Sequence, residues 1–510
     1  MAKGPSVRRN IIANAFGQGW TLLLGIALIP VYIHLMGVES YGLVGLFVTV
    51  QAALMVLDFG LAATVNRELA RGTQDAITAG QMRNLVRTFE WLYWPIAAAI
   101  ACLTLLFAPT VSAKWLNPVE LSASEVARAL TLMGLVAAAQ WPSSLYSGGL
   151  AGLQRQGILN VLVVVFATLR SAGVIVPLLL IEASITIFFV WQLAVSVVQT
   201  AAFATALWRS MPRGDRPTFS RAEATRIASF AGGVAGMAAT SFVLLQFDRV
   251  ILASLLDLKS FGYYATAAAL ATAIPRLVQP VSTAVYPRYS QLVVGQDEVR
   301  LRHLYHKTNQ AVAVLLATVG VIGCCYAESI LLLWTASPDV AAAAGNILKL
   351  LVTASVFGAL ASLPYSLQLA YGNTRLSLSL SVLGICIYVP TLWFAANAHG
   401  AIGAATTWLG LNAVLLIVGV NLMHRKMLVG SQARWYLRDV LPVFAAALGA
   451  GLAVHALWPT LPRSLGGLVL LIFATTAVGS AALLAARDVR TDAIAVASAF
   501  IRGRRASRQR

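Results

Sequence analysis

Residues 158–181 read ILNVLVVVFATLRSAGVIVPLLLI, an apolar run that contains one charged residue, Arg170. A helix needs about 20 mostly apolar residues to cross the hydrocarbon core of a bilayer. This run is long enough, and at 1.5 Å per residue Arg170 would lie about 18 Å along it, near the middle of the membrane. The stretch therefore predicts a spanning helix that carries a cation at depth.

The rest of the chain has the same apolar character. Of 510 residues, 59% are hydrophobic and 11% are charged, whereas a soluble domain carries about 25% charged residues. The composition predicts an all-α polytopic membrane protein. Read by run length, it has about 14 transmembrane helices, near residues 10–36, 41–66, 89–112, 126–150, 158–181, 184–208, 227–255, 261–287, 309–334, 341–371, 376–396, 401–423, 439–458 and 465–486.

The basic residues test this topology. A formal net charge of +18 would suit a nucleic-acid partner, but the Lys and Arg residues form short clusters between the apolar runs. Only Lys114, Lys259 and Arg463 fall in the loops expected outside, which is the asymmetry of the positive-inside rule. We therefore expect both termini to be cytoplasmic, with membrane lipids and no nucleic acid as partners.

An internal repeat indicates how the helices are organised. Ser40-Tyr41-Gly42 recurs as Ser260-Phe261-Gly262, and Leu150–Arg155 recurs as Leu369–Arg375, both at shifts of 219 to 220 residues. An even number of helices per repeat predicts two parallel six-helix repeats around a central cavity, plus two C-terminal helices. The expected domains are 1–215, 216–430, the extra helix pair 431–486 and a basic cytoplasmic tail 487–510, with a hinge at the polar, Pro-containing stretch 209–217.

Ionisable residues inside the expected helices are the candidate site. A charge at bilayer depth costs at least about 2.5–3.5 kcal/mol, so it should meet a watery cavity or a partner. One interpretation is a cationic cavity for an anionic ligand such as a diphosphate or an acidic sugar; the other is fixed ion pairs or side chains that reach an interface. The candidate substrate-binding residues are Arg170, Arg276, Lys349, Arg249 and Asp248.

The sequence shows no motif for catalysis. No lysine follows a glycine, so there is no Walker A loop for ATP, and the histidines are scattered, with His303 and His306 in a predicted cytoplasmic loop. The cysteines lie in apolar stretches without metal-ligand spacing and are interpreted as packing residues. We expect no enzyme activity, no catalytic residue, no metal and no cofactor.

Several motifs resemble those of a known family. They are Asn14, Pro30, Gly37–Gly42, Asp58-Phe59-Gly60 with Arg67–Ala70, Asp248–Ile251, Phe261–Tyr264, and Pro280 with Tyr286–Ser290. Over about residues 1–430 the chain is similar to the polysaccharide-transport family, the flippases of lipid-linked O-antigen or exopolysaccharide repeat units. That family belongs to one superfamily with multidrug exporters and the lipid II flippase.

The resemblance implies a function. It implies that a polyprenyl-diphosphate-linked oligosaccharide moves from the cytoplasmic to the outer leaflet of the bacterial inner membrane by alternating access. Coupling to H⁺ or Na⁺ stays open, and a polysaccharide polymerase and a chain-length regulator are candidate partners. The alternatives are a cation-coupled multidrug exporter of the same superfamily, a membrane glycosyltransferase, polymerase or ligase, and a helical scaffold without transport.

Overall fold

The computed structural model describes residues 7–58, 60–72, 78–214, 216–221 and 246–491. Their regular structure is helical, with one isolated bridge between Asn117 and Asp257. The chain forms two compact units, residues 1–265 and 266–510, and each is described by itself. The repeat boundary at 215/216 and the other expected domain limits remain predictions.

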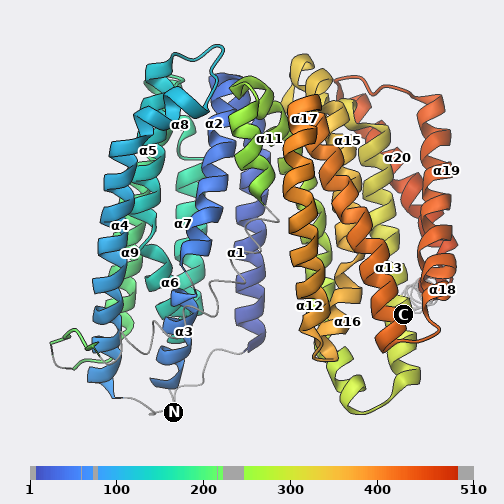
Figure 1. Ribbon diagram of the computed structural model, residues 1–510, viewed down its shortest axis with the longest axis horizontal. Helices are drawn as coiled ribbons and strands as arrows, with labels where there is room; N and C mark the ends of the chain where they lie inside the picture. Colours follow the sequence, from blue (N-terminus) through green and yellow to red (C-terminus); the bar gives the residue numbers. More distant parts are fainter. Residues whose placement is uncertain (1–6, 59, 73–77, 215, 222–245, 492–510) are drawn as a thin grey trace, which may run out of the picture. The chain divides into compact units, whose positions relative to one another are not determined.

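In the first unit, α5 packs on α4 and α9, α7 packs on α9 and α1, and the short helices α3 and α6 pair (Figure 1). Residues 246–255 are also helical, and α11 runs across the unit boundary. The bounds are α1 Val7–Ala27, α2 Ile29–Leu57, α3 Leu61–Gly72, α4 Ala79–Trp115, α5 Ala123–Gln140, α6 Ser143–Gly152, α7 Gln156–Ser171, α8 Ile175–Leu180, α9 Ile185–Ser210 and α11 Leu258–Ala271.

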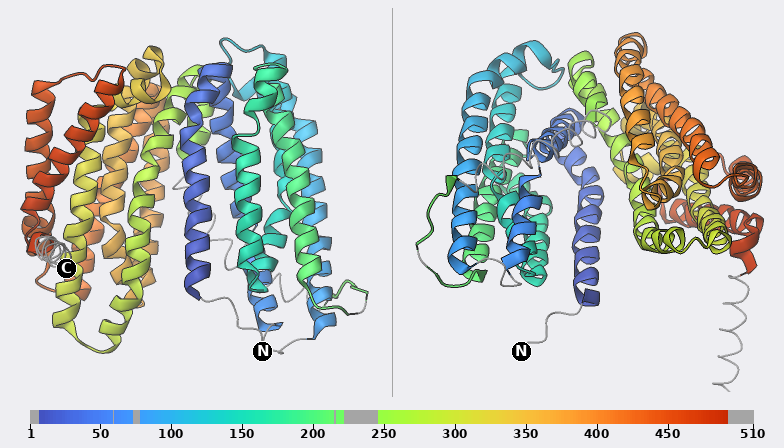
Figure 2. Two further views of the ribbon diagram at one scale, coloured as in Figure 1. Left: turned by 180° about the vertical axis from the view of Figure 1, so that it is seen from behind. Right: turned by 60° about the horizontal axis from the view of Figure 1, so that its bottom comes forward.

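In the second unit, α13 is the central helix, because α12, α15, α19 and α20 all pack on it (Figure 2). The last helix pair, α19 and α20, thus lies against α13. The bounds are α12 Ala273–Val294, α13 Glu298–Cys325, α14 Ala327–Thr335, α15 Pro338–Leu360, α16 Ser362–Ala370, α17 Thr374–Met427, α18 Gln432–Arg434, the π-helix η1 Trp435–Val440, α19 Leu441–Leu457 and α20 Leu465–Ala485.

Within the described ranges, nine helical stretches are long and apolar enough to cross a bilayer. This confirms an all-α polytopic membrane protein. The expected number of 14 helices remains a prediction, and the helix expected at 227–255 lies mostly outside the described residues.

Many expected helices consist of two shorter ones. The helix expected at 261–287 is α11 and α12, which break at Thr272, three residues before Pro275. The helices expected at 376–396 and 401–423 are instead continuous in α17 and meet at a kink at Gly400 (φ 57°), in the link expected between them. Such breaks and kinks follow from residues that do not continue a regular helix.

The stretch 288–308, which the sequence predicts as the inside link carrying His303 and His306, is wrong as a loop. It is almost entirely helical, because α12 continues to Val294 and α13 already begins at Glu298. The Asp297 carboxylate caps α13 by accepting from the Arg300 backbone N–H at 3.1 Å. His303 and His306 therefore lie on a helix, and His306 is buried. The polar sequence that suggested a loop is a helix that continues beyond its apolar part.

The repeated motif at Gly42 and Gly262 forms a reciprocal contact within the first unit. A Cβ added at Gly42 would lie 2.6 Å from the Leu258 carbonyl oxygen, and one added at Gly262 would lie 2.3 Å from that of Val38. Residue 38 meets 262 as residue 42 meets 258, which is the pattern that a local two-fold axis produces. Only glycine lets the two backbones approach this closely.

The second repeated motif is also a structural repeat, but in a different register. The turns that follow α6 and α16 each contain one left-handed residue, Gln154 (φ 57°) and Gly372 (φ 70°), 218 positions apart. The Arg155 N–H donates to Leu150 O at 2.9 Å, and the Asn373 N–H donates to Gln368 O at 3.0 Å. Both turns are Schellman-type helix ends, so the expected shift of 219 to 220 is corrected to 218 here.

The segment that follows the expected hinge at 209–217 is held on α4. The Thr218 N–H donates to Asn84 Oδ1 at 2.7 Å, and the Ser220 N–H donates to Thr88 Oγ1 at 3.0 Å. Residues 218 and 220 are thus anchored at the N-terminal part of α4. A hinge in the link between the halves remains a prediction.

Candidate functional site: a cationic cluster and a polar helix face

Arg170 lies in the last turn of α7, at the position that the sequence predicts to be mid-membrane. Its guanidinium Nη2 donates to Gln199 Oε1 at 2.7 Å and to Ser196 Oγ at 3.3 Å, both on α9. Gln192 Nε2, on the same helix, donates to the Arg170 carbonyl oxygen at 3.0 Å. Three residues spaced along one face of α9 therefore hold Arg170 in place.

Two further glutamines complete this group. Gln51 Nε2 on α2 donates to Gln140 Oε1 on α5 at 2.9 Å. With the Gln140 amide turned the other way, its oxygen faces the Arg170 guanidinium instead. We call Gln51, Gln140, Arg170, Gln192, Ser196 and Gln199 the Arg170 cluster; it draws on four helices of the first unit.

The Arg170 cluster carries an uncompensated positive charge. None of the carboxylates in the described ranges forms an ion pair with Arg170, whose described partners are neutral amides and a hydroxyl. A guanidinium has five N–H donors in a planar fork, and its Nε–H has no partner among the described residues. The half-buried side chain can therefore donate to a further acceptor, and an anion would supply the missing charge.

Arg276 lies on an exposed polar face of α12. Thr272, Arg276, Gln279, Thr283 and Tyr286 follow one another at intervals of four and three residues, so they share one face of the helix, and all five are exposed. The opposite face is packed, with buried Ile274, Val278 and Tyr289 among others. We call the five exposed residues the Arg276 stripe.

The sequence predicts that α12 is part of a spanning segment, at 261–287, and in that position the Arg276 stripe is unsuited to lipid. Polar and charged side chains on a spanning helix face a water-filled path or a partner because hydrocarbon cannot solvate them. Arg276 forms no ion pair with any carboxylate of the described residues. Like Arg170, it can donate to an anion.

Lys349 is paired. Its Nζ lies 3.4 Å from Glu328 Oε1 and 3.1 Å from Asn346 Oδ1, and the side chains of Lys349 and Glu328 are 39% and 58% exposed. This is the fixed ion pair that the sequence left open as the alternative for a buried cation. An exposed pair of this kind contributes little to stability. A substrate role for Lys349 remains a prediction.

Asp248 and Arg249 do not pair with each other in the described contacts. The Asp248 carboxylate accepts a hydrogen bond from the Tyr264 hydroxyl on α11. Arg249 is half-buried and within electrostatic range of the Tyr41 hydroxyl. Neither residue joins the Arg170 cluster, and their roles remain predictions.

Asp58, from the motif Asp58-Phe59-Gly60, has a structural role. Its carboxylate accepts from the Tyr93 hydroxyl at 2.5 Å, from Ser144 Oγ at 3.0 Å and from the Ala62 N–H at 3.1 Å. The last bond satisfies a free backbone donor in the first turn of α3. Asp58 therefore helps to fix the corner between α2 and α3.

The sequence prediction included ionisable residues only and therefore did not include the glutamines of the Arg170 cluster. Gln51, Gln140, Gln192 and Gln199 all stand inside runs expected to span the membrane. An amide at bilayer depth also needs a partner, and Gln192 and Gln199 are seven residues apart, hence on one helix face. That spacing was the signal that could have placed them around Arg170.

The fold and these polar surfaces define a multi-pass membrane protein that holds positive charge within its spanning helices. The chain belongs to the polysaccharide biosynthesis protein family, whose model matches residues 7–293. A Shigella flexneri protein named "Putative O-antigen transporter" is 21% identical over 408 residues, which is 79% of this chain and 94% of that protein.

Two solved structures have the same fold. The lipid II flippase MurJ, in an inward closed conformation, matches 92% of this chain and 98% of its own with a TM-score of 0.71 at 12% identity. An inward-facing multidrug resistance transporter of the MATE family, in the MOP superfamily, matches 84% of this chain and 98% of its own with a TM-score of 0.63 at 14% identity. These relatives are transporters and flippases rather than enzymes.

Proposed function

We propose that this protein is a flippase for a polyprenyl-diphosphate-linked oligosaccharide, an O-antigen or exopolysaccharide repeat unit. It would carry this lipid from the cytoplasmic to the outer leaflet of the bacterial inner membrane by alternating access. The family supports a polysaccharide precursor as the substrate class. A relative named for O-antigen transport supports transport as the activity.

The observation that carries the proposal is Arg170. A cation that costs at least about 2.5–3.5 kcal/mol at bilayer depth is held by neutral groups and leaves donors free. A bound diphosphate would offset that free-energy cost, because arginine binds phosphate oxygens through its planar fork. The Arg276 stripe adds a second cation, with hydroxyls and an amide that suit a glycan.

The charge of the passenger sets the energetics. Moving two negative charges outward across a potential that is negative inside gains about 4.6 kcal/mol per 100 mV, at about 2.3 kcal/mol per charge. A cationic site that moved with the passenger would cancel this gain, and the cycle would then need coupling to H⁺ or Na⁺. The protein needs no ATP site under either scheme.

The proposal is tested by neutralising both cations. In a strain that lacks the chromosomal gene, Arg170→Gln with Arg276→Gln should abolish surface-polysaccharide export while the protein reaches normal levels in the membrane. Arg288→Gln is the matched control, because Arg288 is an exposed arginine on α12 outside the Arg276 stripe, and it should export normally. Normal export by the double variant would refute the cationic-site assignment.

The second candidate is a cation-coupled drug exporter, which the MATE-family fold favours. Such a transporter would bind its coupling cation at a buried acid. Asp58 and Asp248 instead accept hydrogen bonds from tyrosines, and the buried Asp439 contacts His306. Drug resistance that depended on Asp248, with no effect of the double arginine variant on polysaccharide export, would favour this candidate.

A further inference from the structure

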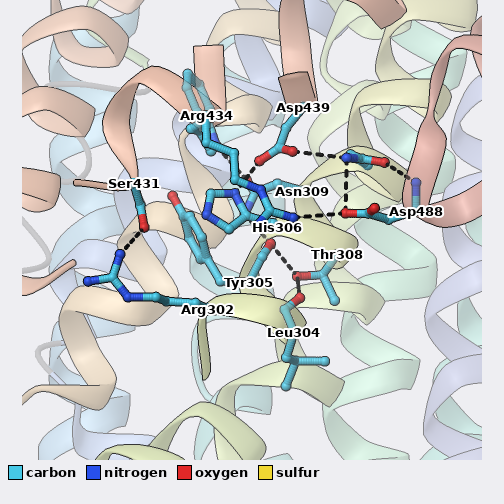
Figure 3. Close-up of polar contacts among 12 residues, drawn as sticks. Arg302, Leu304, Tyr305, His306, Thr308, Asn309, Ser431, Arg434, Asp439 and Asp488 are labelled. Carbon is cyan, nitrogen blue, oxygen red and sulfur yellow. Dashed lines mark hydrogen bonds and ion pairs between the residues drawn. The ribbon is translucent and has the colours of Figure 1, made fainter. Parts of the chain in front are cut away.

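A buried polar network joins α13 to the C-terminal helices (Figure 3). His306 Nδ1 on α13 contacts Asp439 Oδ2 on η1, and these side chains are 1% and 0% exposed. Gln310, one turn further along α13, donates to the other Asp439 oxygen at 2.9 Å. The Asp439 carboxylate is thus bound on both oxygens in the interior of the second unit.

The network continues to the segment after α20. Gln310 Oε1 accepts from the Asp488 N–H at 2.9 Å, and Gln310 Nε2 also lies 3.3 Å from Asp488 Oδ2. Arg434 on α18 pairs with the same Asp488 oxygen at 3.2 Å. One side chain of α13, Gln310, therefore contacts both Asp439 and Asp488, which lie on either side of the last helix pair.

One proton decides the net charge of the His306–Asp439 pair. Gln310 donates to Asp439 Oδ1, whereas the donor in the contact between His306 Nδ1 and Asp439 Oδ2 depends on the histidine tautomer. Among the residues that the structure describes, His306 is the single basic side chain in contact with Asp439, because Arg434 pairs with Asp488. A buried carboxylate without a compensating cation is costly, so the buried pair favours the form that holds one more proton and is neutral overall.

The surrounding groups from the other elements are either neutral or directed elsewhere. Tyr305 on α13 packs edge-on against both His306 and His424 of α17, and His424 Nδ1 is bonded to the Val420 carbonyl oxygen at 2.9 Å. Arg302 on α13 donates to Ser431 Oγ and Val429 O. Tyr436 on η1 donates to Asn421 on α17.

Two further features mark the site as one that changes state. Asp439 lies in a π-helix, an irregularity that recurs at functional positions in helices. The buried Tyr305 hydroxyl and His424 Nε2, beside His306, have no hydrogen-bond partner within the described part of the chain, although buried polar atoms are normally paired. This arrangement therefore leaves hydrogen-bonding capacity beside His306 unused.

We propose that His306 and Asp439 form a proton-binding site that controls the docking of the C-terminal helices, η1, α19 and α20, on α13. With the proton bound, the His306–Asp439 pair is neutral overall and the helices are docked. Loss of the proton leaves a buried carboxylate without its cation, so the η1 end separates from α13. The inference does not depend on which passenger the protein carries.

The test measures the distance between α13 and η1. Spin labels at Val299→Cys and Leu437→Cys, whose native side chains are 80% and 63% exposed, report docking by double electron–electron resonance in lipid nanodiscs. The background lacks the native cysteines, Cys102, Cys324, Cys325 and Cys386. The pH is varied across and beyond the ordinary histidine range, from about pH 5 to about pH 9.

In the doubly labelled protein with His306 and Asp439 intact, we expect one short distance between the labels at low pH and a second, longer distance at high pH. The ratio of the two populations should change by up to about tenfold per pH unit, the limit for one linked proton. His306→Gln with Asp439→Asn replaces the pair by two neutral amides, so this variant should stay docked at every pH. His303→Gln, an exposed histidine on the same helix, is the control and should keep the full response.

Either of two results would overturn the proposal: a distance that does not change with pH in the unmodified background, or an unchanged pH response in the His306→Gln, Asp439→Asn variant. Because no passenger is present, a failure here says nothing against the flippase assignment. Conversely, the Arg170→Gln, Arg276→Gln variant should show the same distances between the labels at each pH, even when it no longer exports polysaccharide.

Discussion

Replacing Arg170 by glutamine should separate a binding role from a structural one. The introduced glutamine keeps an amide donor near Gln199 and Ser196 but has no charge. The lost charge-assisted hydrogen bonds are worth about 1.5–3 kcal/mol each, while removing a cation from bilayer depth relieves at least about 2.5–3.5 kcal/mol. The two effects nearly offset each other, so the stability of the variant should stay close to that of the unmodified protein.

Binding should respond differently, because no such compensation exists for the passenger. One charge-assisted hydrogen bond to a diphosphate is worth about 1.5–3 kcal/mol, which corresponds to about a 10- to 150-fold loss of affinity. The affinity of Arg170→Lys for the diphosphate should lie between those of the unmodified protein and Arg170→Gln, since an ammonium keeps the charge but not the planar fork.

The assay is binding of a polyprenyl diphosphate to the purified protein in nanodiscs, together with thermal unfolding of the same samples. The reasoning predicts weakened binding with an unfolding midpoint close to that of the unmodified protein. It would be refuted if Arg170→Gln bound the diphosphate normally and lost several degrees of thermal stability, because Arg170 would then be a packing residue.

Two other changes test the first unit. Glu39 is buried and its carboxylate accepts from the backbone N–H groups of residues 119, 120 and 121, so Glu39→Gln should cost about 1.5–3 kcal/mol in thermal unfolding; an unchanged midpoint would contradict this. Gly262→Ala should destabilise by about 1–3 kcal/mol because its Cβ would lie 2.3 Å from Val38 O, whereas Gly19→Ala, with open space around it, should not. Equal midpoints for the two alanine variants would count against the close packing.

The fold was readable from the sequence where a single physical rule applies. Run length and composition sufficed to predict an all-α, multi-pass chain, whereas the count of about 14 helices and the depth of Arg170 in the membrane remain predictions. The link at 288–308 was misread because a polar stretch between apolar runs is equally compatible with a loop and with a helix in water. A cap at Asp297 was the local sign of the helix.

The candidate site was harder to predict because its partners are distant in sequence. Nothing local to Lys349 identifies Glu328 as its partner, and nothing local to His306 points to Asp439 on η1. Such pairs depend on which helices become neighbours. The glutamines around Arg170 were within reach, because an amide inside an apolar run needs a partner as a charge does.

Translocation in proteoliposomes tests the central claim most directly, that positive charge within the spanning helices binds an anionic lipid head. The same fluorescent oligosaccharide is attached either to a polyprenyl diphosphate or to a neutral lipid of equal chain length, and its transfer between leaflets is followed. The account predicts protein-dependent transfer of the diphosphate lipid alone, lost in the Arg170→Gln, Arg276→Gln variant. Equal transfer of both lipids, or an undiminished rate in that variant, would contradict it.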